Sequence, residues 1–201
     1  LIVDGGKLAK NKPSTVIDAT ESEIKILRRG DLITGKTTSL ISKSEKETEK
    51  IAEFLLKRQK MGGKPLVFLL SGDLGCGKTV FSRKVGHLLG VKEKIVSPTY
   101  IIYNEYKIQN PPVDKSTSSL KEGRKSLEKN WKFLHMDLYK ITSEKDLEEI
   151  KFLDLFEENT VSCIEWPEQM GENYLKKLRE KTNVVSVNFE YVDEKTREIR
   201  Y

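Results

Sequence analysis

The chain contains a glycine-rich stretch, GDLGCGKT at residues 72–79, that matches the pattern G-x-x-x-x-G-K-[ST] in full. An apolar stretch, LVFLL, precedes it, and an amphipathic helix-like pattern follows it. A loop of this kind, set between a buried strand and a helix, turns its backbone N–H groups towards phosphate oxygens. We expect Lys78 to contact the terminal phosphates and the Thr79 hydroxyl to bind Mg²⁺. The pattern therefore predicts a site for a nucleoside triphosphate and Mg²⁺.

Two carboxylates and a threonine could supply the other groups that triphosphate hydrolysis needs. Asp137 follows the strand-like stretch FLHM, as the acidic residue near Mg²⁺ does in other phosphate-loop proteins. Glu165 follows VSCI and precedes Trp166. A carboxylate at the end of a buried strand and beside an indole is costly to bury, so we expect it to have a functional role. Thr99 lies in SPTY, where a switch loop is expected. The alternative, that these residues only form turns or structural contacts, stays open.

The remaining reactive side chains are two histidines and two cysteines. His135 alternates with Met136 in a predicted strand, which is more typical of a structural histidine than of a base. His87 lies in the middle of a predicted helix and is expected at the surface. Cys76 and Cys163 are too far apart in sequence for a metal-ligand motif, so we expect two reduced thiols.

Predicted strands alternate with helices in the first part of the domain, and strands predominate after it. The apolar run LVFLL is typical of a strand covered on both faces by helices. The pattern predicts helices at 44–62, 78–89 and 143–149, strands at 66–70, 100–106, 131–138 and 161–166, and a closing antiparallel hairpin at 183–191 and 197–201. This order favours an α/β fold, a P-loop NTPase-like three-layer sandwich with a mixed β-sheet.

The chain divides into a short front segment and one larger domain. Residues 1–33 contain short β-like pieces that cannot close a core alone, and residues 34–201 contain the phosphate loop. Residues 107–130 include two prolines, several serines and an excess of basic residues. We expect a flexible basic insertion there, with contact to RNA or an acidic partner as the alternative.

The composition fits a protein of the cytoplasm. The 36 Lys and Arg residues exceed the 31 Asp and Glu residues only slightly, so an anionic partner is permitted but not required. No apolar run approaches the roughly 18–20 residues of a membrane span, and no signal peptide is visible, so we expect no membrane association. The chain starts with Leu1 within a strand-like LIV, and we expect it to be cut from a longer polypeptide.

Four motifs in order, GDLGCGKT, SPTY with NEY, HMDLYK and IEWPE, closely resemble the bacterial TsaE ATPase family. This family acts in making the threonylcarbamoyl modification of the adenosine next to the tRNA anticodon. The resemblance implies a small P-loop α/β fold that binds ATP and Mg²⁺ and hydrolyses ATP slowly. It also implies docking on the TsaB–TsaD heterodimer, so that hydrolysis resets the complex between turnovers and tRNA is engaged indirectly through that complex.

The resemblance implies roles for particular residues. Lys78, Asp137 and Glu165 are expected to be catalytic, and Thr79, Asp137 and Glu165 are expected around Mg²⁺. The expected ATP-binding residues are Gly72, Asp73, Leu74, Gly75, Cys76, Gly77, Lys78, Thr79, Val80, Thr99 and Trp166.

The front segment has a resemblance of its own. The stretches PSTVID and ILRRG in residues 1–33 are similar to the C-terminal end of a YrdC-type domain, the family that makes threonylcarbamoyl-adenylate for the same modification. Because the main substrate-binding motifs of that family are absent, we expect a remnant without activity of its own, derived from a synthase–ATPase fusion.

Two other functions remain open at this point. One is a small-molecule phosphotransferase of the P-loop class, although the 107–130 segment has few arginines for a lid. The other is a nucleotide-operated assembly factor whose hydrolysis is incidental. A GTPase is disfavoured because no [NT]-K-x-D motif follows the phosphate loop.

Overall fold

The computed structural model describes residues 16–18, 25–28, 38–59, 63–98, 101–109 and 130–201. The chain forms two compact units, Leu1–Thr38 and Ser39–Tyr201. In the first unit, β1 (Val16–Asp18) and β2 (Lys25–Arg28) pair antiparallel. Most of the predicted basic insertion and of the front segment lies outside the described residues.

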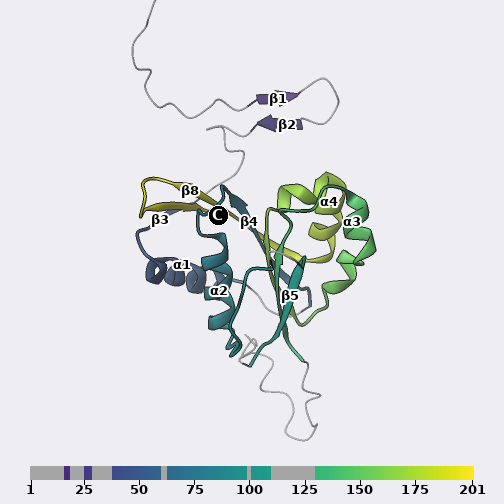
Figure 1. The fold of residues 1–201 in the computed structure, drawn as a ribbon, viewed down its shortest axis with the longest axis horizontal. Helices are drawn as coiled ribbons and strands as arrows, with labels where there is room; N and C mark the ends of the chain where they lie inside the picture. Colours follow the sequence, from purple (N-terminus) through teal and green to yellow (C-terminus); the bar gives the residue numbers. More distant parts are fainter. Residues whose placement is uncertain (1–15, 19–24, 29–37, 60–62, 99–100, 110–129) are drawn as a thin grey trace, which may run out of the picture. The chain divides into compact units, whose positions relative to one another are not determined.

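The second unit is built on a mixed sheet, which the described residues show with seven strands (Figure 1). Its order is β3 (Ser39–Ser42), β9 (Arg197–Arg200), β8 (Asn183–Tyr191), β4 (Leu66–Gly72), β7 (Thr160–Glu165), β6 (Lys132–Asp137) and β5 (Tyr103–Lys107). The four central strands, β8 to β6, are parallel, and the outer strands are antiparallel. Parallel strands end at a common edge, and this edge carries the site described below.

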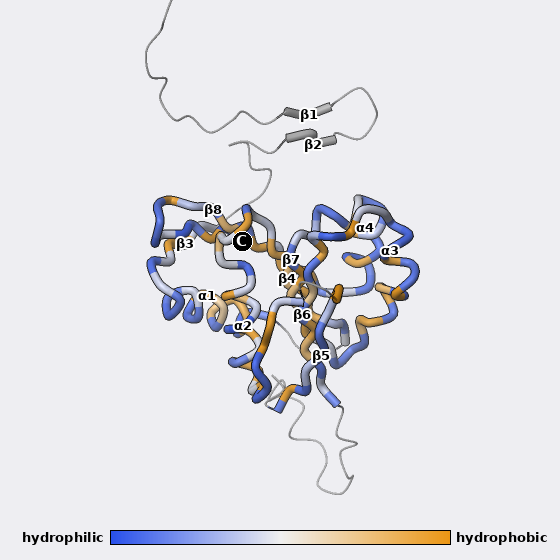
Figure 2. The backbone as a smooth tube through the Cα atoms, viewed as in Figure 1, coloured by the Kyte–Doolittle hydropathy of each residue, from blue (hydrophilic) through white to orange (hydrophobic). Residues whose placement is uncertain are grey.

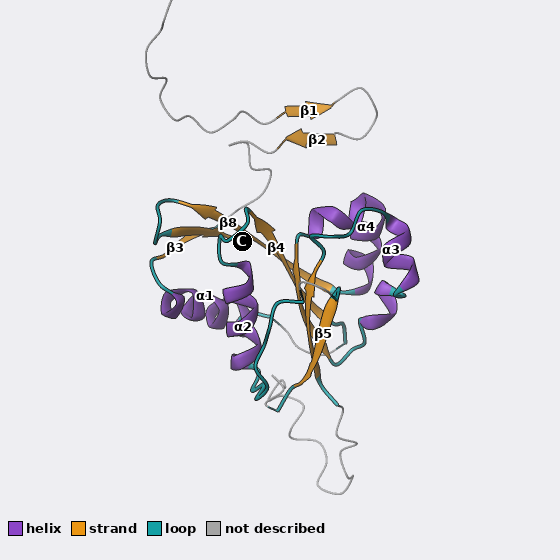
Figure 3. Cartoon of the chain, in the orientation of Figure 1, coloured by secondary structure: helices purple, strands orange, loops and turns teal. Residues whose placement is uncertain are grey.

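Helices cover both faces of the sheet, as Figure 3 shows. On one side lie α1 (Glu45–Lys57) and α2 (Lys78–Leu88). On the other side lie α3 (Glu144–Glu149), α4 (Gly171–Lys181) and the short 3₁₀ helices η2 (Phe152–Leu155) and η3 (Pro167–Met170). The predicted α/β three-layer sandwich with a mixed sheet is confirmed. No helix among the described residues is long and apolar enough to cross a membrane.

Strand β4 shows why a run of apolar residues is needed at the centre of the sheet. Leu66, Phe68 and Leu70 pack into the core beneath α1 and α2, whereas Val67 and Leu69 pack into the core beneath α3 and α4. Because successive side chains of a strand point to opposite faces, burial on both faces requires every position to be apolar. Figure 2 shows the hydrophobic residues gathered along the central strands.

Several predicted boundaries differ from the structure. The helix that Ser44 caps ends at Lys57 and not at Gly62-Gly63, since the Arg58 N–H turns to the Leu55 carbonyl and tightens the last turn. The strand predicted at 100–106 begins at Tyr103, and residues 101–102 form a bend. The predicted hairpin is present, but its first strand, β8, also pairs with β4 and is interior.

Candidate functional site

The ends of three neighbouring parallel strands form the site. The register places Leu70 of β4 opposite Glu165 of β7, and Glu165 opposite Asp137 of β6. The phosphate loop, residues 72–79, leaves β4 at this edge and enters α2. The fold therefore brings both predicted carboxylates to the predicted phosphate site.

Two glycines of the phosphate loop are required by its backbone. Gly72 has φ 133° and Gly77, which caps α2, has φ 110°, values that side-chain-bearing residues rarely adopt. A Cβ at Gly72 would also lie 2.3 Å from the Phe189 carbonyl oxygen of β8. The loop is further held from the hairpin side, where the Tyr191 hydroxyl donates to the Leu74 carbonyl at 3.1 Å.

Lys78 is held inside the loop by oxygen acceptors and an aromatic ring. Its side-chain Nζ donates to the carbonyl oxygens of Gly72 at 2.7 Å and Asp73 at 2.8 Å. The same nitrogen lies 3.9 Å from the ring centroid of Trp166, a cation–π contact. Because this ammonium is buried yet satisfied by neutral groups, its positive charge is available to an anion in the loop.

Glu165 is the carboxylate that contacts the predicted Mg²⁺ ligand Thr79. The Thr79 hydroxyl donates to Glu165 Oε2 at 3.0 Å. The other oxygen, Oε1, lies 2.7 Å from His135 Nε2 and 3.5 Å from the Ser82 hydroxyl. Glu165 is only 3% exposed, so these partners offset the cost of burying a charge. Its position follows from strand order, because β7 and not β6 adjoins β4.

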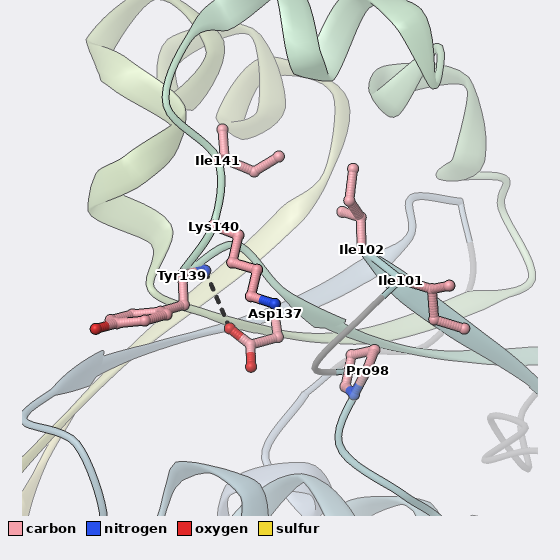
Figure 4. A pocket seen from close by; sticks show the side chains of 7 residues that line it. All are labelled: Pro98, Ile101, Ile102, Asp137, Tyr139, Lys140 and Ile141. Carbon is pink, nitrogen blue, oxygen red and sulfur yellow. Dashed lines mark hydrogen bonds between the residues drawn. The ribbon is translucent and has the colours of Figure 1, made fainter.

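Asp137 lies in a more open setting than Glu165. Its Oδ1 accepts one hydrogen bond from the Tyr139 backbone N–H at 3.0 Å. Partial burial, and next the nearby Glu165 charge, raise the pKa of the Asp137 carboxyl above its ordinary value of 3.8. Figure 4 shows this side chain at the wall of a small pocket, which is lined by Pro98, Ile101, Ile102, Asp137, Tyr139, Lys140 and Ile141. Asp137 therefore faces the segment that precedes and follows Thr99.

Trp166 follows Glu165 at the end of β7 and has a strained backbone. Its φ of 59° and ψ of 50° place it in the left-handed region, which costs a non-glycine residue of order 1–3 kcal/mol. Its N–H donates to the Leu70 carbonyl of β4, and its ring packs 5.1 Å from that of Tyr139. In this conformation the indole lies against Lys78 of the phosphate loop.

The structure assembles most of the residues expected from the sequence. Lys78, Thr79, Asp137, Glu165 and Trp166 converge at the loop. Asp73 and Leu74 are exposed at the loop surface, Cys76 is buried beneath it, and Val80 is half-buried in the first turn of α2. Thr99 lies outside the described residues.

Two contacts of the site are not predicted by the sequence. His135 was expected to be structural, and its contact with Glu165 is new, although period-2 alternation in β6 puts His135 on the same sheet face as Asp137. The bond from Tyr191 to the loop is also new, because no local pattern links residues 117 positions apart. His87 is exposed, as expected.

Comparison with protein families gives a match over most of the chain. A family model described as threonylcarbamoyl adenosine biosynthesis protein TsaE matches residues 42–199. The match includes the phosphate loop and both carboxylates. It does not include residues 1–33, whose resemblance to a YrdC-type domain stays a prediction.

Curated relatives agree with the family model. The tRNA threonylcarbamoyladenosine biosynthesis protein TsaE of Rickettsia felis is 31% identical over 159 residues, covering 79% of this chain and 75% of the relative. The protein of the same name from Haemophilus influenzae is 29% identical over 146 residues, covering 73% of this chain and 75% of the relative. The crystal structure of Bacillus subtilis YdiB is similar with a TM-score of 0.49 and 22% identity, over 82% of this chain and 84% of that chain. Since the family model spans most of its length, the chain belongs to the threonylcarbamoyl adenosine biosynthesis TsaE family.

Proposed function

We propose that this protein is an Mg²⁺-dependent, slow ATPase of the tRNA threonylcarbamoyladenosine modification machinery. Its hydrolysis would reset the TsaB–TsaD complex between rounds of modification, and tRNA would be met through that complex. The observation that carries the proposal is the contact of Thr79 with Glu165 at the end of a complete phosphate loop, in a chain of the TsaE family. The slow rate and the partners rest on the family resemblance.

The donor set fits Mg²⁺ bound together with a nucleotide. The described residues contain no group of three or more His, Cys, Asp or Glu side chains that could hold a metal alone. Mg²⁺ usually takes one or two protein oxygens and completes its shell with water and substrate phosphates. The Thr79 hydroxyl and Glu165 carboxylate offer two such oxygens 3.0 Å apart, and Asp137 follows on the next strand.

Each residue of the site has a distinct part in the proposed reaction. The loop N–H groups and the N-terminus of α2 would bind the phosphates, and Lys78 would move from the Gly72 and Asp73 carbonyls to the terminal phosphates. Bound Mg²⁺ supplies neutralisation of the charge that develops on the phosphate oxygens. Glu165, whose Oε1 contacts His135, would orient the attacking water. Thr99 would act from the switch segment, and Trp166 would close one side of the loop.

Reconstitution tests the proposal. The chain is combined with TsaB, TsaD, tRNA and a source of threonylcarbamoyl-adenylate, and tRNA modification is followed over many turnovers. We expect rounds after the first to require both this chain and ATP. If modification continues equally well without the chain, the proposed role is wrong. If ATP is instead consumed in proportion to the formation of a phosphorylated metabolite, the protein is a phosphotransferase.

The variant Lys78→Ala tests the phosphate loop itself. We expect ATP affinity to fall by at least about 100-fold, because a buried, charge-assisted contact to phosphate is lost. Lys84→Ala is the matched control, since Lys84 lies on the same helix but its Nζ pairs with Glu49 at 3.3 Å. ATP affinity retained in Lys78→Ala would exclude the loop as the nucleotide site.

A further inference from the structure

His135 lies between the candidate site and the segment that leads to Thr99. Its imidazole is fully buried, with 0% of the residue exposed. On one side Nε2 contacts Glu165 Oε1 at 2.7 Å, and on the other side Nδ1 contacts the Val96 carbonyl oxygen at 3.1 Å. The ring thus spans the distance between a site carboxylate and a backbone group two residues before Pro98.

The chemistry of the two partners determines which hydrogen bonds the ring nitrogens make. The Val96 oxygen can only accept, so Nδ1 must carry a hydrogen for this contact to be a hydrogen bond. The short contact from Nε2 to Glu165 also needs one hydrogen between the two atoms. Both ring nitrogens are therefore engaged at once, which fixes the orientation of the ring and, through it, the orientation of the carboxylate.

The backbone at Val96 is itself held on both sides. Its N–H donates to the Tyr106 hydroxyl at 3.1 Å, and its carbonyl also accepts from Asn104 Nδ2 at 3.3 Å. Val96 is 45% exposed, so the segment is held here through its peptide groups and not by burial of the residue. His135 is consequently anchored to a backbone position that β5 supports.

We propose that His135 is a positioning residue that holds the Glu165 carboxylate against Thr79 and links it to the Val96 peptide group. This inference rests on the proposed ATPase function and assigns its site a further residue. The Oε1 atom of Glu165 is engaged by His135, so Oε2 is directed to the Thr79 hydroxyl. The two ring contacts of His135 are with Val96 and Glu165, so His135 acts on the phosphate loop through Glu165.

Two amide substitutions separate the two contacts of the ring. In His135→Asn the amide lies near the position of Nδ1 and can keep the bond to Val96, whereas in His135→Gln it lies near the position of Nε2 and can keep the bond to Glu165. We expect His135→Asn to lower kcat for ATP about 10- to 100-fold and His135→Gln to retain most of it. ADP affinity measured without Mg²⁺ should stay within about threefold in both, because phosphate binding by the loop is untouched.

The chain offers a matched control in its other histidine. His87 is exposed on α2, and His87→Asn and His87→Gln should leave kcat unchanged. Equal loss of turnover in both His135 variants, or no loss in either, would overturn the proposal while wild-type hydrolysis still supports the ATPase. Loss of ADP affinity without Mg²⁺ would also overturn it, because His135 would then act on the loop.

A double-mutant cycle tests the contact without any need for hydrolysis. The unfolding equilibrium in urea is measured for wild type, His135→Asn, Glu165→Gln and the double variant. We expect the two substitutions to be non-additive, with a coupling of about fivefold or more in the unfolding constant. Additive effects would show that His135 and Glu165 do not interact, and would overturn the proposal.

The cycle also separates this proposal from the proposed function. If wild type hydrolyses no ATP but the coupling is present, the proposed function fails and the positioning of Glu165 stands. If His135→Asn does not fold, the same cycle is made with His135→Gln, and coupling should then be weaker because the amide keeps the contact.

Discussion

Glu165 and Asp137 are register partners at the ends of neighbouring strands, but their surroundings differ. Glu165 is 3% exposed and has side-chain partners on both oxygens. Asp137 is half-buried at a pocket wall, and its Oδ1 accepts a hydrogen bond from the Tyr139 backbone N–H. The difference arises from strand order, because β7 lies against β4 and beneath α2, whereas β6 is one strand further away.

This comparison suggests a division of work between the carboxylates. A group whose hydrogen bonds are already made in the folded chain needs little reorganisation when the reaction begins. Glu165 is of this kind. Asp137 is instead a partly buried charge with few partners, which a bound cation would stabilise. Removing each carboxylate should therefore have opposite consequences for stability as well as unequal consequences for turnover.

The largest effect is expected for Glu165→Gln. Turnover of ATP should fall about 100- to 1,000-fold, since the group that orients water and contacts Thr79 loses its charge. Stability should also fall, because the amide keeps one acceptor oxygen, whereas the carboxylate uses one oxygen for Thr79 and the other for His135. Single-turnover ATP hydrolysis and urea unfolding measure the two effects. Glu168→Gln is the control, as Glu168 is exposed on η3. Unchanged turnover in Glu165→Gln would show that Glu165 has no role in hydrolysis.

A smaller loss of turnover, about 10-fold, is expected for Asp137→Asn, together with a gain in stability. The amide oxygen can still accept from the Tyr139 N–H. Folding raises the pKa of Asp137, so its ionised form is disfavoured in the folded state and costs stability at neutral pH. Tm of the variant should exceed that of wild type at pH 7, and the excess should disappear as the pH falls through the raised pKa towards 3.8. A lower Tm at pH 7 would contradict the comparison.

The smallest expected effect is the reaction of the two cysteines near this edge of the sheet with a thiol reagent. Cys76 and Cys163 have 0% exposure, and burial raises the pKa of both thiols. A thiolate is the reactive form, so both should resist a thiol-specific reagent at pH 8 until urea unfolds the chain. Labelling followed by mass spectrometry gives the rate at each position. Rapid labelling of Cys163 in the folded protein would mean that β7 opens in solution. The burial of Glu165 at the end of the same strand would then be in conflict with the labelling.

The sequence predicted the parts of the fold that have local causes. The apolar run of β4, the Ser44 and Ser143 caps and the glycines of the phosphate loop each act within a few residues. The described elements that were not predicted include β3, whose Ser39 pairs with Arg200, α4, which has no side-chain cap, and the short helices η2 and η3. A four-residue strand that pairs with the other end of the chain leaves little local pattern to detect.

The same reasoning explains what was missed at the site. Both carboxylates were expected near the loop, because each follows a strand. Which of them contacts Thr79 depends on the order β4-β7-β6, and that order is a property of the tertiary structure. The contact of His135 with Glu165 depends on the same order. Sequence therefore indicates the groups of such a site better than it indicates their partners.

The support that β8 gives to the phosphate loop has a consequence for biosynthesis. β4 lies between β7 and β8, which are both translated much later, and the β8–β9 hairpin provides the Phe189 carbonyl against Gly72 and the Tyr191 hydroxyl bound to Leu74. A nascent chain that stops before residue 183 has the whole loop sequence but no strand on that side. We expect such ribosome-bound chains to gain no protection from protease when ATP is added, whereas chains that expose residue 201 should gain it. The loop is thus translated early, but its final shape depends on the β8–β9 hairpin, which is translated more than 100 residues later.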